Sequence, residues 1–285
     1  MLNKNLWKKA CQDTLFYIKL EGGSYLKILF IGDVFGRPGR NVLRNCLETL
    51  KTEYFIDLVI ANVENAAGGN GLTITTAEEL FSYGIDIMTS GNHIWDKKEV
   101  LELLNKENKI LRPLNYPLGT PGKGYVIIEK NGYKVAVINL LGRVYNNSLV
   151  DCPFKTLESV LEKIYIETPI IIVDFHAEAT SEKYALGWFA DGKVSAICGT
   201  HTHVQTADNR ILEKGTAYIT DVGMTGPYNS IIGIESNIVI EKFLKALPVR
   251  FEVAKGPTQF NGVYIEIDER TGKATDIQRL FFVYS

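Results

Sequence analysis

The stretch Gly199-Thr200-His201-Thr202-His203 decides how the rest of the sequence is read, because it places two histidines directly after the apolar run Val194 to Cys198. The chain contains four histidines, and the other two, His93 and His176, also follow apolar runs that are typical of β-strands. An open α/β sheet gathers the loops at the carboxyl ends of its strands in one crevice, where ligands bind. We therefore expect the four histidines to converge on one metal site.

The composition indicates an ordinary globular protein. The chain has 285 residues, enough for one large α/β domain or two small ones, with a hydrophobic fraction of 46% and a charged fraction of 22%. Its formal net charge of −2 gives no general attraction for nucleic acid or an anionic membrane, so local groups must hold any phosphate-bearing ligand. Four scattered cysteines without a C-x-x-C pair predict neither a disulfide framework nor a thiolate zinc site, and they indicate a cytoplasmic protein.

The N-terminal segment from Met1 to Leu26 differs from the rest of the chain. It carries four lysines among isolated apolar residues, and it lacks both the apolar core and the cleavage site of a secretory signal. It reads as a leader, a start-site artefact or an extra helix. Residues 27–285 show no convincing domain boundary, so we predict that they form a single domain.

Three strand–loop–helix units follow one another after this segment. Their predicted strands each end in polar residues: Lys27 to Ile31 before Asp33, Asp57 to Ala61 before Glu64 and Asn65, and Ile85 to Thr89 before Asn92 and His93. The second unit continues with a predicted helix from Thr75 to Tyr83, and the third with one that Asp96 is expected to cap. This alternation predicts the α/β fold class.

The second half of the chain adds strands of other kinds. Tyr125 to Ile128 and Lys134 to Leu140 flank Asn131-Gly132, which predicts a hairpin. Pro169 to Val173 reads as a strand buried on both faces and ends near His176, while the last 30 residues alternate apolar and polar as in a closing antiparallel hairpin. Further helices are expected at 154–166, 181–189 and 236–244.

The predicted strand ends collect oxygen and imidazole ligands. This mixture suits Mn, Fe or Zn better than Mg, which rarely recruits several imidazoles. A single catalytic zinc takes about three protein ligands, whereas this set is large enough for two ions that share a bridging carboxylate. The candidate residues are Asp33, Glu64, Asn65, Asn92, His93, His176, His201 and His203.

The charges of this set favour a phosphate substrate. Ionised Asp33 and Glu64 supply −2 against +4 from two divalent ions, which leaves about +2 for a hydroxide and an anionic substrate. Two such ions lower the pKa of a bridging water and clamp the phosphoryl oxygens, and a protonated histidine then supplies a proton to the departing alkoxide.

Five motifs carry a resemblance to a known family. The sequence resembles the calcineurin-like metallophosphoesterases, and in particular the YmdB family of bacterial phosphodiesterases, over essentially Lys27 to Ser285. The resemblance implies a layered fold with mixed β-sheets flanked by helices and a metal site at the carboxyl ends of the strands. The motifs are Gly32-Asp33-Val34-Phe35-Gly36, Asn62-Val63-Glu64-Asn65, Gly91-Asn92-His93, Phe175-His176-Ala177-Glu178 and Gly199-Thr200-His201-Thr202-His203, with Asp221 to Gly226 supporting the branch.

The resemblance also implies roles for individual residues. Asp33, Glu64, Asn65 and His203 would hold one ion, Glu64, Asn92, His176 and His201 the other, and Glu64 would bridge them. His93 would be the proton donor rather than a ligand. The implied reaction is hydrolysis of phosphodiesters, 2′,3′-cyclic nucleotides among them, with Fe or Mn expected and Zn as an alternative. The wider superfamily has histidine where this chain has Phe35, and Asn65 would supply the missing ligand.

Several of these residues have structural alternatives. Asp33 is also a candidate cap and Asn65 a candidate turn residue. Asp221 is expected either to accept a hydrogen bond from a ligating imidazole or to cap its own loop. Arg37 and Arg143 are either phosphate clamps or solvated surface residues.

Two other functions use the same residues. A phosphomonoesterase or nucleotidase would employ the same centre, and a non-catalytic regulator would bind a nucleotide or RNA through a structural metal. The partners expected are a small phosphodiester or nucleotide and, as an open alternative, a second copy of the chain, with neither a stable nucleic-acid complex nor a membrane.

Overall fold

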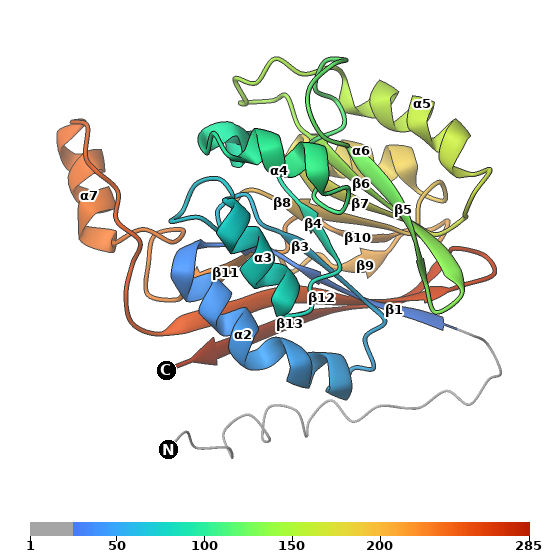
Figure 1. Cartoon of the computed structure of the whole chain (residues 1–285), viewed down its shortest axis with the longest axis horizontal. Coiled ribbons are helices and arrows are strands. Elements are labelled where there is room, and N and C mark those ends of the chain that lie inside the picture. Colours follow the sequence, from blue (N-terminus) through green and yellow to red (C-terminus); the bar gives the residue numbers. More distant parts are fainter. Residues whose placement is uncertain (1–24) are drawn as a thin grey trace.

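The computed structural model describes residues 25–285, so the expected N-terminal leader lies outside the described residues except for its last two (Figure 1). Those two, Tyr25 and Leu26, open strand β1 (Tyr25–Ile31), in which Leu26 is fully buried. The predicted start of the strand at Lys27 was therefore two residues late, because the alternation of buried residues already begins at Leu26.

The strands form two mixed sheets. The first has the order β2-β11-β12-β1-β3-β4, with β13 paired to β12, and the second has the order β5-β6-β7-β8-β10-β9. Their bounds are β2 Asp33–Val34, β3 Leu58–Asn62, β4 Ile87–Thr89, β5 Tyr125–Lys130, β6 Tyr133–Leu141, β7 Ile171–His176, β8 Ala196–Thr200, β9 Arg210–Ile211, β10 Ala217–Ile219, β11 Met224–Pro227, β12 Thr258–Asp268 and β13 Ala274–Tyr284.

Helices cover the outer face of each sheet. Buried residues of α2, α3 and α4 pack on the first sheet, and those of α5 and α6 pack on the second. In Figure 1, α2 and α3 lie in front of the strands of the first sheet. The helices are α2 Gly36–Glu53, α3 Ile74–Ser82, α4 Val100–Lys106, α5 Pro153–Ile164, α6 Thr180–Ala190 and α7 Ser236–Lys245, with a 3₁₀ helix η1 at Asn92–Asp96.

Alternation along the strands explains why the two sheets stack. In β1, Ile28 and Phe30 face the core between the sheets, whereas Leu29 and Ile31 face the helices of the first sheet. Successive side chains of a strand point to opposite faces, so a strand that is apolar at every position is stable only between two layers. The fold is therefore a helix–sheet–sheet–helix stack, which confirms the expected layered α/β architecture.

Parallel pairing brings the predicted strand ends to shared edges. In the first sheet β1, β3 and β4 run parallel, and in the second β6, β7 and β8 run parallel. The hairpin of β5 and β6 and the closing hairpin of β12 and β13 are antiparallel, as predicted. The polar residues that follow the parallel strands consequently meet at one end of the stack.

One predicted helix cap was wrong. Asp96 does not cap α4, whose N-cap is Glu99, because Asp96 ends η1 and its carboxylate bonds to His93 instead.

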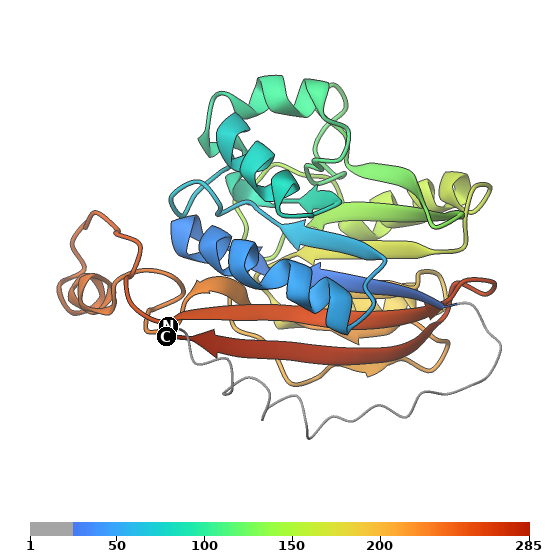
Figure 2. The ribbon, with the colours of Figure 1, turned by 60° about the horizontal axis from the view of Figure 1, so that its bottom comes forward.

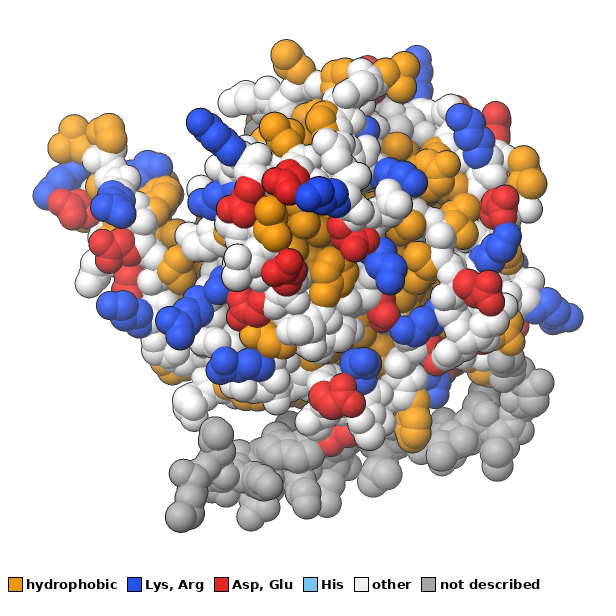
Figure 3. All heavy atoms as spheres, viewed as in Figure 1, with side chains coloured by type: hydrophobic (Ala, Val, Ile, Leu, Met, Phe, Trp, Pro, Cys, Tyr) orange, Lys and Arg blue, Asp and Glu red, His pale blue; other side chains and the backbone are white. Residues whose placement is uncertain are grey.

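The surface carries charges of both signs, and α7 stands apart from the stack (Figures 2 and 3). Val239 is its buried residue, while Phe243 and Leu244 are exposed. Among the described residues, no helix combines the length and the apolar character that crossing a bilayer requires.

The core between the sheets is expected to dominate the stability. Replacing the fully buried Ile172 of β7 with Ala should lower the free energy of unfolding by about 2–5 kcal/mol, since it removes apolar contacts and leaves a cavity. The exposed Leu118 changed to Ala should alter it by less than about 0.5 kcal/mol. Urea unfolding measures both, and a similar small loss for the two variants would contradict this assignment of the core.

Candidate metal centre

The His-x-His loop begins where β8 ends and is held in an unusual backbone conformation. His201 and His203 have φ of 103° and 66°, which non-glycine residues rarely adopt unless the surroundings hold them there. The buried Lys183 Nζ donates to the Thr200 carbonyl at 2.8 Å and to Asp221 Oδ2 at 2.6 Å. The same Asp221 oxygen accepts from the Thr202 N–H at 3.0 Å. Lys183 and Asp221 thus fix the loop backbone.

Two glycines let the strand ends approach closely. A Cβ atom at Gly199 would lie 1.7 Å from the Thr220 carbonyl oxygen. A Cβ atom at Gly91 would lie 2.2 Å from His176 Cδ2 and 2.4 Å from Glu64 Oε2. Any larger residue at Gly91 would displace these side chains.

Glu64, His176 and His201 converge on one point. His176 Nε2 lies 3.0 Å from Glu64 Oε1 and 2.9 Å from His201 Nδ1. One ligand atom from each of the three lies within 4.8 Å of the others. Asn92 follows Gly91 and precedes His93, whose N–H donates to Glu64 Oε2 at 3.0 Å. The structure thereby brings Glu64, His176 and His201 together, and Asn92 precedes the residue whose N–H bonds to Glu64.

Asp33, Asn65 and His203 form a second group beside the first. His203 Nε2 lies 3.2 Å from Asn65 Oδ1 and 3.8 Å from Asp33 Oδ1. Asp33 Oδ2 accepts from the His201 N–H at 3.2 Å, which joins the two groups. Asn65 Nδ2 also donates to the Gly69 carbonyl, so this residue serves a glycine turn and the site together. Asp33 caps no helix, since the N-cap of α2 is Phe35.

Hydrogen bonds on the outer side of each imidazole fix which nitrogen faces the site. His203 Nδ1 donates to the Ile232 carbonyl at 3.0 Å, and His201 Nε2 to Glu178 Oε2 at 3.0 Å, because these oxygens can only accept. His176 Nδ1 donates to Thr200 Oγ1, whose own proton goes to Asp174 Oδ1 at 2.7 Å. Each ring then turns its other nitrogen inward, where it can act as a ligand once a cation displaces any proton that it carries.

These inward atoms can all act as ligands of one cation site. Two of the facing pairs are His176 Nε2 with His201 Nδ1 and His203 Nε2 with Asn65 Oδ1. Asp33 Oδ1 and Asn92 Oδ1 are buried and have no hydrogen-bond partner within residues 25–285. Buried polar atoms normally have partners, so this donor set is suited to hold a divalent cation.

Burial and mutual attraction shift the pKa values of the carboxylates and imidazoles of this site. Burial raises the pKa of Asp33. Burial opposes ionisation of Glu64 and His176, but their mutual attraction outweighs it and moves the pKa of Glu64 to about 2 and that of His176 to about 9. Burial, with the neighbouring His176, lowers the pKa of His201 to about 3, which keeps that imidazole neutral.

His93 differs from the other histidines. Its side chain is 37% exposed, and Nδ1 bonds to Asp96 Oδ2 at 2.9 Å. Because Nδ1 is engaged with a carboxylate outside the cluster, Nε2 is the nitrogen that can exchange a proton with a bound ligand.

Sequence reasoning missed the residues that support the ligands. Glu178 lies in a quoted motif, but nothing in its spacing assigned it to His201. Lys183 gave no sequence signal, because a lysine within an amphipathic helix normally reads as a surface residue. Asp221 supports the loop backbone rather than an imidazole.

The structure also shows where two candidate phosphate clamps and three other side chains lie. Arg37 and Arg143 are exposed. Cys198 is fully buried in the core between the sheets. Tyr184 and Trp188 share a side of α6, where both rings contact the Arg210 guanidinium.

Two known proteins are similar to this chain, one in sequence and one in sequence and fold. A 2′,3′-cyclic-nucleotide 2′-phosphodiesterase from Bacillus subtilis (strain 168) is 52% identical over 255 residues, which cover 90% of this chain and 96% of the relative. The crystal structure of a phosphatase from Mycoplasma pneumoniae is 40% identical and superposes with a TM-score of 0.88 over 92% of this chain and 95% of that one.

A more distant structure shares the fold alone. The NAD nucleotidase of Haemophilus influenzae is 14% identical and superposes with a TM-score of 0.59 over 92% of this chain and 56% of its own length. The family described as YmdB-like protein matches residues 29–280, nearly the whole described chain, including every residue of the cluster. The chain therefore belongs to the YmdB-like protein family.

Proposed function

We propose that this chain is a metal-dependent phosphodiesterase that hydrolyses small phosphodiesters, among them 2′,3′-cyclic nucleotides. The observation that carries the proposal is the convergence of one ring nitrogen from each of three imidazoles on two buried carboxylates. The 52% identity to a relative named for cleavage of 2′,3′-cyclic nucleotides supports the choice of substrate class. A phosphomonoesterase would use the same residues, and comparing turnover of monoesters and diesters separates the two.

The proposed centre holds two divalent ions, with Fe or Mn expected and Zn as the alternative. Asp33, Glu64, Asn65 and His203 would hold one ion, and Glu64, Asn92, His176 and His201 the other. When bound, such ions supply electrophilic activation of the phosphoryl group and of the attacking water. The mixture of oxygen and imidazole donors supports this choice of metal.

His93 is proposed to protonate the leaving oxygen. The Asp96 carboxylate orients the ring through Nδ1, so that Nε2 is the nitrogen that would deliver the proton. The backbone N–H of His93 bonds to Glu64. That bond fixes the position of the proton donor relative to the proposed bridging carboxylate.

The proposal also includes the number of domains, the cellular compartment and the oligomeric state. Residues 27–285 would form one domain, and the protein would act in the cytoplasm on a small nucleotide, alone or as a homo-oligomer. A purely regulatory binder would lack part of the ligand set or the proton donor, and the closeness of Glu64 to His176 and His201 and of His203 to Asn65 supports a catalytic centre instead.

Replacing His93 with Ala should leave the metal content nearly unchanged and lower kcat by about 10²- to 10⁴-fold, because general acid catalysis is lost. The loss should be greatest for diesters with poor leaving groups. Elemental analysis and a series of aryl phosphodiesters measure both effects. An equal loss of metal would show that His93 is a ligand instead.

Replacing Glu64 with Ala should remove both ions, since the variant loses the proposed bridge. Elemental analysis of the purified variant measures this, with Glu79→Ala as a control in which a carboxylate paired with Arg40 is removed away from the centre. A Glu64 variant that keeps a full metal complement would exclude the bridging role.

A further inference from the structure

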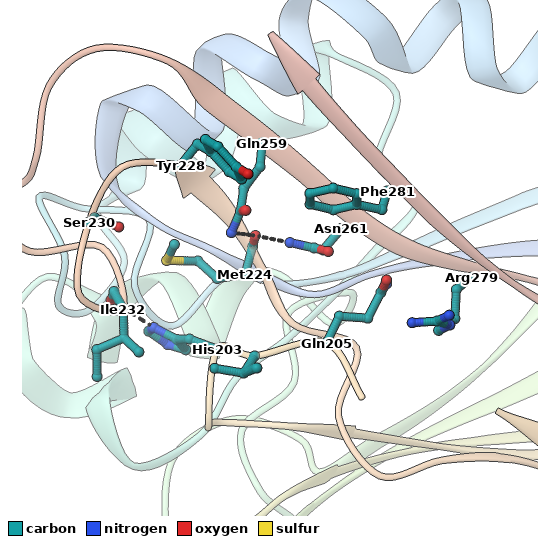
Figure 4. Close-up of a pocket in the computed structure, with 11 residues that line it drawn as sticks. His203, Gln205, Met224, Tyr228, Ser230, Ile232, Gln259, Asn261, Arg279 and Phe281 are labelled. Atoms are coloured by element: carbon teal, nitrogen blue, oxygen red, sulfur yellow. Dashed lines mark hydrogen bonds between the residues drawn. The ribbon is translucent and has the colours of Figure 1, made fainter. Parts of the chain in front are cut away.

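A pocket of about 580 Å³ opens beside His203 (Figure 4). The His-x-His loop lines it through His203 and Gln205, and strands β12 and β13 line it opposite. The segment that follows β11 adds Tyr228 and Ile232. Because Nε2 of His203 faces Asn65 and Asp33, the pocket adjoins the metal centre.

The pocket arises where the inner face of the first sheet changes character. Along β12, Val263, Ile265 and Ile267 face the core between the sheets. Side chains two residues apart share a face of a strand, so Gln259 and Asn261 continue the same face with amides. In β13, Ile277 likewise packs in the core. Arg279 and Phe281 continue that face into the pocket.

The lining suits a planar, uncharged ring attached to an anion. Of the eleven described residues that line the pocket, Arg279 is the one Lys or Arg and none is Asp or Glu. Tyr228 and Phe281 are 46% and 50% exposed, and their ring centroids lie 6.3 Å apart. Half-exposed aromatic rings beside a pocket are surfaces on which nucleobases stack.

Hydrogen bonds hold the two amide side chains of β12 that line the pocket. Asn261 Nδ2 and Gln259 Nε2 both donate to the Met224 carbonyl, at 2.7 and 3.2 Å (Figure 4). Their nitrogen atoms are thereby engaged, and Asn261 Oδ1 has no hydrogen-bond partner within the described part of the chain. These bonds hold the Gln259 and Asn261 side chains in fixed orientations at the pocket.

Resting on the phosphodiesterase function proposed above, we propose that this pocket binds the nucleobase of the substrate. The base stacks on Tyr228 and Phe281, while the phosphate lies at the metal centre beyond His203. The pocket would then determine the preference for nucleotides over other small phosphodiesters. Its volume is within the range of about 300–1,000 Å³ that is usual for small-ligand sites.

The test compares a substrate with a base and one without. Steady-state kinetics are measured on the metal-loaded chain with 2′,3′-cyclic AMP and with methyl riboside 2′,3′-cyclic phosphate. The variants are Phe281→Ala and Tyr228→Ala, with Phe281→Tyr as the conservative change. Phe243→Ala is the matched control, because it removes an exposed aromatic ring from α7, outside the pocket.

For the two pocket variants, the ratio of kcat/KM for the nucleotide to that for the base-free substrate should fall about five- to hundredfold, mainly through KM, since base–aromatic stacking has that magnitude. Phe281→Tyr and Phe243→Ala should keep the wild-type ratio. A ratio that stays constant in both pocket variants, or a wild-type chain that cleaves the base-free substrate equally well, would overturn the base pocket and leave the phosphodiesterase function intact.

If the wild-type chain cleaves neither substrate, the proposed function fails. A binding measurement then tests the base pocket separately. Adenosine 3′-monophosphate is then titrated into the metal-loaded chain by calorimetry. A five- to hundredfold weaker Kd in Phe281→Ala would support the base pocket. Equal Kd values in wild type and variant, or no binding at all, would overturn it.

Discussion

The candidate metal centre depends on burying two carboxylates, Asp33 and Glu64, against the inward nitrogens of three imidazoles. Moving ionised carboxylates out of water is costly unless positive charge compensates them. Within the described chain that charge is a proton shared by Glu64 and His176, while Asp33 Oδ1 keeps no hydrogen-bond partner. A bound cation would satisfy the carboxylates, the amide oxygens and the imidazoles together, which is why the donor set and its electrostatics support the same proposal.

The scaffold supplies the geometry that this concentration of negative charge requires. Parallel strands in two stacked sheets bring loops from distant parts of the sequence to one end, and Gly91 and Gly199 remove the side chains that would separate them. The Lys183–Asp221 pair then holds the His-x-His loop in backbone conformations that its histidines would not adopt alone. The Lys183–Asp221 ion pair therefore stabilises the strained backbone of the loop.

Much of this arrangement could be predicted from the sequence, because the strands are apolar at consecutive positions and each one ends in a potential ligand. The closing hairpin followed from periodicity, and the layered fold was what the resemblance implied. The supporting contacts could not be predicted, since Glu178 and Lys183 act through tertiary neighbours rather than through spacing. Asp96 illustrates the limit, because a residue typical of a helix cap orients His93 instead. The pocket beside His203 could not be predicted either, because its lining comes from strands and loops that are distant in the sequence.

The most direct test of the central claim is the number of metal ions that the purified wild-type chain holds, measured by elemental analysis together with hydrolysis of 2′,3′-cyclic AMP before and after chelation. The account predicts about two divalent ions per chain, loss of turnover when they are removed, and recovery on adding Mn²⁺ or Fe²⁺. A chain that hydrolyses the nucleotide at the same rate after complete removal of metal would contradict it.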